Sequence, residues 1–161
     1  MANEPEAVAS PPSSGPRRKQ RGERSRPGLG ARRLALLALF EEEFRPQQAV
    51  EALDRLAIER GASKGVGDHA RQIVLGVLEH RSALDRRIAD QAPAIPVSEL
   101  GRVERTILRS ALFEMLYSAA TPSGETIEDA VSLARIYAGD AARRLVNGVL
   151  GSVARSSGGG G

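Results

Sequence analysis

The chain has 161 residues, of which 41% are apolar and only 3% aromatic, and this length fits one domain with tails. It has no cysteine, which excludes disulfide bonds and thiol chemistry and agrees with a cytoplasmic location. No apolar run approaches the roughly 18 residues of a membrane span, and the N-terminus lacks the apolar centre of a secretory signal, so we expect no association with a membrane.

The net charge of +3 is unevenly distributed along the chain. From Arg17 to Arg33 there are eight basic residues and one acid, Glu23, so this block carries +7 and leaves −4 for the remainder. A basic segment on a mildly acidic body indicates contact with a polyanion at one end of the molecule. The alternative is a tail that only keeps the protein soluble.

The first 30 residues are rich in Pro, Ser, Gly and Arg and offer too little apolar surface to offset the entropy lost on folding. They therefore predict a disordered arm over residues 1–30. The arginines continue into Arg32 and Arg33, where the first helix is expected to begin. An arm anchored there can follow a phosphate backbone and become ordered on binding.

Apolar residues at helical spacing predict six helices, with Pro, Gly and Ser near their ends. The three glutamates of 41–43, at the end of the first helix, are expected to be solvated. Glycines predict a loop at 61–67, before the third helix, and a flexible tail at 156–161. The expected helices are 31–44, 47–60, 68–90, 100–117, 125–137 and 141–154.

The segment 100–117 is the most strongly helical and apolar run of the chain, and its apolar residues cover an arc of about 220° at 100° per residue. We expect other helices to enclose it on more than one side. Glu104 interrupts the apolar arc, where an unpaired carboxylate would be costly. Either it lies near solvent or beside an arginine, or this end of the face is left open for a partner protein.

No segment shows sustained alternation with β-branched residues, so strands are not expected. The sequence predicts an all-α protein, a compact bundle of about six to seven helices over residues 31–155.

Groups that could carry out chemistry are scarce. His69 and His80 are the only histidines, with no convincing third ligand beside them, so we expect neither a metal site nor a cofactor. Carboxylates such as Asp85 and Asp129 stand at helix positions where solvation or pairing with arginine is the usual explanation. The sequence favours binding over catalysis.

Three runs, LGRVERTILRSALFEMLY, TPSGETIEDAVSLARIY and RRLVNGVLGSVAR, occur in an order and spacing that resemble the NusB family of bacterial transcription antitermination factors. The opening ARRLALLALF is similar to that family's first helix. The resemblance implies an all-helical fold that binds a small-subunit ribosomal protein, NusE. With NusE it would recognise a single-stranded boxA element in nascent RNA and help RNA polymerase resist termination on ribosomal RNA operons.

The resemblance also implies roles for individual residues. Phe40 and Glu104 would belong to the surface that faces NusE, and the same surface can support a homodimer. Gly148 either permits close packing or belongs to a functional surface, and Arg144 either is solvated or extends the basic surface. The candidate RNA-binding residues are Arg17, Arg18, Lys19, Arg21, Arg32, Arg33 and Arg144.

Two other functions fit the same pattern of residues. One is an accessory domain related to a ribosomal RNA cytosine methyltransferase, but the chain stops soon after its last expected helix, without a catalytic domain. The other is a helical scaffold that binds only protein and has an inert tail. Because sequence-specific recognition of single-stranded RNA relies on stacking and this chain has few aromatic residues, we expect weak RNA binding alone and tighter binding with NusE.

Overall fold

The computed structural model describes residues 26–118 and 123–158, and these are helical almost throughout. They contain no strand, which confirms the all-α prediction. Six α-helices and one short 3-10 helix follow in this order: α2 Pro27–Phe44, α3 Ala49–Glu59, α4 Lys64–Gln91, η1 Val97–Glu99, α5 Arg102–Tyr117, α6 Ser123–Ala138 and α7 Asp140–Gly158.

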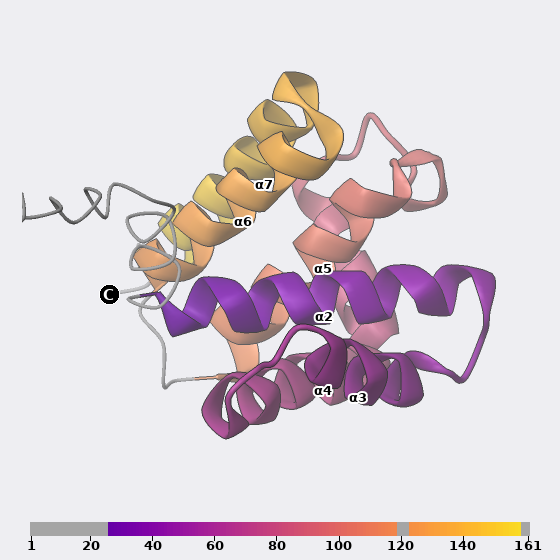
Figure 1. The fold of residues 1–161 in the computed structure, drawn as a ribbon. Coiled ribbons are helices and arrows are strands. Elements are labelled where there is room, and N and C mark those ends of the chain that lie inside the picture. The colour runs from indigo at the N-terminus through magenta and orange to yellow at the C-terminus, as the bar shows by residue number, and fades with distance from the viewer. Residues whose placement is uncertain (1–25, 119–122, 159–161) are drawn as a thin grey trace, which may run out of the picture.

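Two helices organise the bundle. In Figure 1, α2 crosses the middle of the molecule, with α3 and α4 on one side and α6 and α7 on the other. Helix α2 contacts α3, α4, α5 and α6, and α5 contacts α2, α4, α6 and α7. The expectation that the segment 100–117 is enclosed on several sides is therefore confirmed, and α2 shares its central position.

Three helix ends differ by four residues from the sequence-based boundaries, each in a segment whose glycines were interpreted as loop or tail. Helix α2 begins at Pro27 and not at 31, with proline in its first turn, where the missing N–H costs nothing. Helix α4 begins at Lys64 and not at 68, because the Ser63 side chain accepts a hydrogen bond from the Val66 N–H at 3.2 Å. Helix α7 continues to Gly158, into the segment predicted as a flexible tail.

The core is aliphatic, as the composition predicts. Its fully buried side chains are mostly Leu, Ile, Val and Ala, and Phe113 is the only aromatic residue among the buried hydrophobics described. Phe113 packs directly against Gly76 of α4, where an added Cβ would lie 2.1 Å from the Phe113 ring. Gly76 therefore allows α5 to approach α4 closely, and this packing offsets the low helix propensity of glycine.

Candidate nucleic-acid and protein interface

The basic arm joins the folded body at Arg26. Its guanidinium donates a hydrogen bond to Asp129 of α6 and lies 3.8 Å from Glu128. Four of the candidate RNA-binding residues, Arg17, Arg18, Lys19 and Arg21, lie outside the described residues. What the structure describes is therefore the point from which the arm leaves the body.

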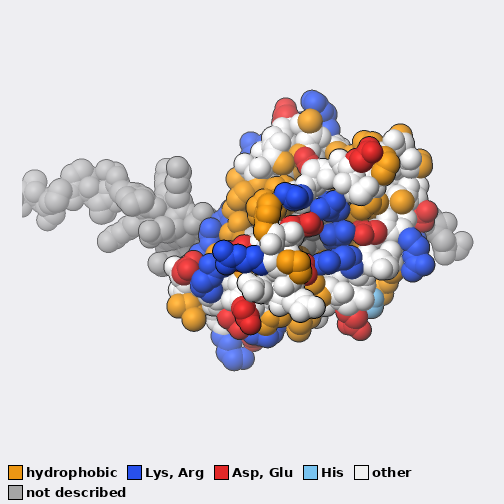
Figure 2. Space-filling model, turned by 90° about the vertical axis from the view of Figure 1, so that its right-hand side faces the viewer, with side chains coloured by type: hydrophobic (Ala, Val, Ile, Leu, Met, Phe, Trp, Pro, Cys, Tyr) orange, Lys and Arg blue, Asp and Glu red, His pale blue; other side chains and the backbone are white. Residues whose placement is uncertain are grey.

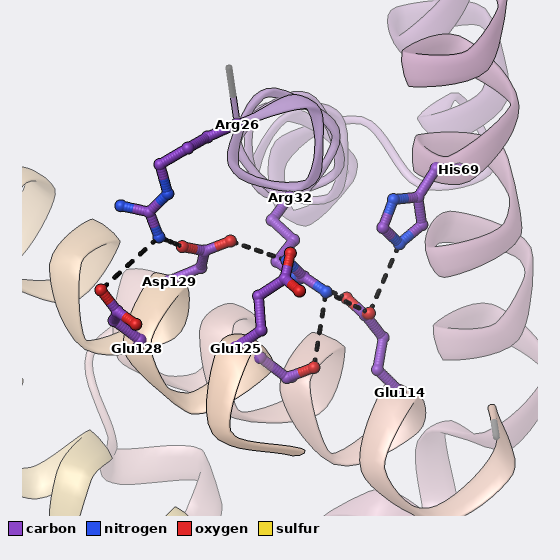
Figure 3. Close-up of polar contacts among 8 residues, drawn as sticks. Arg26, Arg32, His69, Glu114, Glu125, Glu128 and Asp129 are labelled. Atoms are coloured by element: carbon purple, nitrogen blue, oxygen red, sulfur yellow. Dashed lines mark hydrogen bonds and ion pairs between the residues drawn. The ribbon is translucent and has the colours of Figure 1, made fainter. Parts of the chain in front are cut away.

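Arg32 lies inside the bundle, where its side chain is only 5% exposed. Its Nε and Nη2 donate hydrogen bonds to the two carboxylate oxygens of Glu114, both at 2.9 Å, and its Nη1 donates to Asp129 Oδ2 at 2.7 Å (Figure 3). These carboxylates are 3% and 1% exposed. The resemblance implied that Arg32 contacts RNA, whereas in this structure its donors are buried and bound to protein oxygens.

We call Arg32, Glu114 and Asp129 the buried ion cluster. It joins α2, α5 and α6, and His69 extends it to α4 through a contact of 3.4 Å between Nε2 and Glu114 Oε2 (Figure 3). Asp129 uses one carboxylate oxygen for Arg32 and the other for Arg26. The same side chain thus holds the buried arginine and the root of the arm.

The pKa of Glu114 is set by opposing effects. Burial raises it, but hydrogen bonds and charges from His69 and Arg32 outweigh burial, so the pKa lies below its ordinary value of 4.5. For Arg32, burial lowers the pKa, while Glu114 and Asp129 raise it by a larger amount, so the net shift is upward. Both groups therefore stay charged at neutral pH.

Acid should weaken the fold through Glu114. A carboxyl group whose folded-state pKa is depressed contributes stability above its unfolded-state pKa, and that contribution is lost as the pH falls through the folded-state value. We expect the difference in free energy of unfolding between the wild type and Glu114→Gln to be largest near pH 7 and to shrink as the pH falls below 4.5. Urea unfolding of both proteins across this range measures it, and a constant difference would contradict the assignment.

Arg33 and Arg144 are both accessible, but the structure does not bring them together. Arg33 is half-buried and lines a groove beside the junction of α3 and α4. Arg144 is exposed on the first turns of α7 and is not among the residues that line this groove.

The exposed side of α7 continues from Arg144 through Asn147 and Gly148. A Cβ added at Gly148 would meet no atom within 4 Å. Gly148 is therefore not required for close packing, and the packing alternative for this residue is wrong.

The end of α2 and the start of α5 form a second surface, which we call the aromatic corner: Phe40, Phe44, Arg102 and Glu104. The two phenylalanine rings meet edge to face at 5.3 Å, and the Arg102 guanidinium lies 4.6 Å from the centre of the Phe44 ring. Phe44 is 57% exposed. Glu104 is half-buried, and its carboxylate folds back over Gly101, so it stays near solvent.

The three glutamates at the end of α2 hold the bundle together, which corrects the expectation that they are solvated. Glu41 accepts a hydrogen bond from Arg55 of α3, and Glu42 accepts one from Arg81 of α4. Glu43 accepts hydrogen bonds from Arg105 at 2.9 Å and from Arg109 at 3.5 Å, both on α5. Each glutamate therefore ties α2 to a different helix.

Arg109 also forms a two-pronged contact with Asp85, at 2.7 and 2.9 Å, so pairing with arginine is confirmed for Asp85 as it is for Asp129. Figure 2, which views the side on which α2 ends in Figure 1, shows arginine side chains interleaved with carboxylates and bordered by apolar side chains. A mixture of charged and apolar side chains of this kind is also found at the rims of protein interfaces.

Within the described residues, no helix is long and apolar enough to cross a membrane. The same part of the chain contains no group of three or more His, Cys, Asp or Glu side chains placed to hold a metal ion.

The arrangement of helices is that of solved bacterial antitermination factors. A crystal structure of antitermination factors NusB and NusE in complex with dsRNA superposes with a TM-score of 0.74 at 27% identity, covering 81% of this chain and 98% of the matched chain. The solution structure of NusB from Aquifex aeolicus gives a TM-score of 0.69 at 27% identity, over 81% of this chain and 88% of that one.

Sequence comparison agrees. The transcription antitermination protein NusB of Roseiflexus sp. is 43% identical over 76% of this chain and 87% of its own length. That of Carboxydothermus hydrogenoformans is 36% identical over 77% and 90%. The model of the NusB family matches residues 29–155, and the chain belongs to this family.

Proposed function

We propose that this protein is a transcription antitermination factor that binds boxA-type single-stranded RNA together with NusE and raises the processivity of RNA polymerase on ribosomal RNA operons. The observation that carries the proposal is the similarity to NusB in a complex with NusE and dsRNA, which extends over 98% of that chain. The relatives are named as antitermination proteins and not as enzymes, which favours this function over the methyltransferase-related alternative. Such a factor acts on nascent RNA, in the cytoplasm.

The RNA contacts belong to the arm and to accessible arginines of the body. Arg17, Arg18, Lys19 and Arg21 supply charge to the phosphates, and Arg33 and Arg144 extend the contact onto the helices. Arg32 has an indirect role. It holds Asp129 in place, and Asp129 in turn holds Arg26 at the root of the arm.

The aromatic corner is the proposed contact with NusE. An exposed phenylalanine backed by a second ring and covered by an arginine has the composition of an interface hot spot. Glu104 borders it as a half-buried carboxylate that can accept a hydrogen bond from a partner. A homodimer through this surface would compete with NusE.

Binding of RNA should depend on NusE. Because the chain offers few exposed aromatic side chains, we expect weak and poorly selective binding of boxA RNA by this protein alone and tighter binding by its complex with NusE. Electrophoretic titration of boxA RNA with and without NusE measures the difference. Equal affinity in both titrations would contradict the proposal.

The matched control for this experiment is Phe44→Ala, which removes the exposed ring at the aromatic corner and leaves the arm intact. We expect it to lose the gain supplied by NusE and to keep the weak binding of the protein alone. Retention of the full gain would place the NusE contact elsewhere.

A further inference from the structure

The structure contains a basic groove at the root of the arm. Of its lining residues, only Arg33 is among the RNA contacts proposed above. It has a volume of about 580 Å³ and lies between the first turns of α2 and the junction of α3 and α4. Three arginines and no carboxylate line it, namely Arg26, Arg33 and Arg60. Leu29, Leu34 and Val66 supply an apolar floor.

Arg60 differs from the other exposed arginines near the groove. Arg55, one turn earlier on α3, is paired with Glu41, and Arg71 of α4 is paired with Asp54. No carboxylate of the described residues lies within ion-pair distance of Arg60, which is exposed. Its charge is therefore available to a ligand that enters the groove.

Two backbone hydrogen bonds define the turn that follows Arg60. Gly61 has a φ of +60°, and the N–H groups of Gly61 and Ala62 bond back to the carbonyls of Ile58 and Ala57 at 3.1 and 2.9 Å. This pair of hydrogen bonds is the Schellman motif, which ends a helix in one conformation. Arg60 is thus held on the edge of the groove by a fixed turn.

The start of α4 adds positive potential to the same groove. The first N–H groups of a helix lack partners within the helix and favour an anion. The first turn of α4 contains Gly65 and Gly67, and a Cβ added at either would meet nothing within 4 Å. Ser63 and Val66 line the groove, and the open glycines next to them leave the neighbouring backbone accessible to a ligand.

We infer that this groove is a phosphate-binding seat for the RNA strand, with Arg60 and the first turn of α4 forming the wall opposite Arg26 and Arg33. The inference rests on the proposed function and extends it to residues of the α3–α4 junction. The arm reaches the body at Arg26, which is part of the groove, so a strand that follows the basic arm arrives there. A polyanion complements this groove, because no acid is among its lining residues and Arg60 has no carboxylate of the described residues within ion-pair distance, whereas Arg26 is already paired with Asp129 and Glu128.

The test measures RNA binding by the full chain with Arg60→Ala and Arg60→Glu, and Arg55→Ala serves as the control from the same helix. For one phosphate contact on a single strand, log K changes with log salt by about 0.7, so Arg60→Ala should weaken binding about fivefold at 0.1 M salt and lower the salt slope by about 0.7. Arg60→Glu should weaken binding further, and Arg55→Ala should leave it unchanged. Circular dichroism verifies that each variant is folded.

Chemical shifts of the backbone amides report contact directly. On titration with the same RNA oligonucleotide, the amides of Lys64 and Gly65 should shift in the wild type and shift less in Arg60→Glu. If the wild type binds RNA and the Arg60 variants bind equally well, the groove is not the seat and the proposed function stands. If the wild type binds no RNA even with NusE, both the inference and the proposed function are overturned.

Discussion

Replacing Arg32 with alanine is expected to lower the free energy of unfolding by about 3–5 kcal/mol, the cost of breaking a buried ion pair by removing one partner. The variant leaves Glu114 and Asp129 in the interior, 3% and 1% exposed, without the guanidinium that compensates their charges. Glu114 and Asp129 are the buried carboxylates of the described residues, and the variant leaves them only His69 and Arg26 as partners. Urea unfolding at pH 7 measures the change.

Two controls separate this effect from a general loss of charge. Arg55→Ala removes an arginine whose ion pair with Glu41 lies at the surface, and it should change stability little. The double variant Arg32→Ala, Glu114→Ala should cost less than the sum of the two single variants, because it leaves one fewer charge unpaired. If Arg32→Ala were as stable as Arg55→Ala, the buried ion cluster would not support the fold.

The burial of Arg32 also changes how RNA-binding experiments should be designed. A loss of RNA affinity in Arg32→Ala would follow from a weakened fold and a displaced arm root, whether or not this side chain ever meets RNA. Arg33 is the informative neighbour, because it lines the groove and lies outside the buried ion cluster. The choice between an RNA-binding factor and a protein-only scaffold therefore depends on Arg33 and the arm.

The fold was predictable because helical periodicity is a local property of the sequence. Apolar residues three and four apart identified all six helices, and the absence of alternation excluded strands. The errors lie at helix ends rich in glycine, at 27–30 and 64–67, where the residue type indicates a loop and tertiary packing supports a helix. One N-cap contact, Ser63 to Val66, decides the start of α4.

The buried ion cluster was not predictable from charge alone, because its members are far apart in sequence. Glu114 and Asp129 lie 82 and 97 residues from Arg32. Adjacent residues on a helix point about 100° apart, so Arg32 and Arg33 cannot share an environment. A signal existed nonetheless: Arg32 stands one turn before Ala35 and Leu36 on the apolar side of α2, which indicates burial.

The same argument applies to Glu41, Glu42 and Glu43. Three successive glutamates look like a solvated run, and at the C-terminal end of a helix they oppose its dipole. Each instead faces a different helix, since successive positions rotate by about 100°, and each meets an arginine there. Their partners, Arg55, Arg81 and Arg105, become evident only in the tertiary structure.

Deleting residues 1–25 is expected to weaken RNA binding by up to about 3,000-fold at 0.1 M salt. The deletion removes five basic residues and three acids, Glu4, Glu6 and Glu23, but keeps Arg26 and its contact with Asp129. If each of the five neutralises one phosphate of a single strand, the slope of log K against log salt should fall by about 3.5. Titration of boxA RNA with the NusE complex at several salt concentrations measures both quantities.

Two variants of the arm separate the effect of its charge on RNA binding from the effect of its sequence. An arm in which the arginines of 17–24 are replaced by lysine keeps its charge and should retain most of the affinity, because the phosphate contact is electrostatic. An arm in which Arg17, Arg18, Lys19, Arg21 and Arg24 become glutamine should behave like the deletion. If deletion leaves RNA binding intact and Arg33→Ala does the same, the basic end of the molecule does not hold RNA. That result would favour the alternative function, a helical scaffold that binds only protein and does so through the aromatic corner.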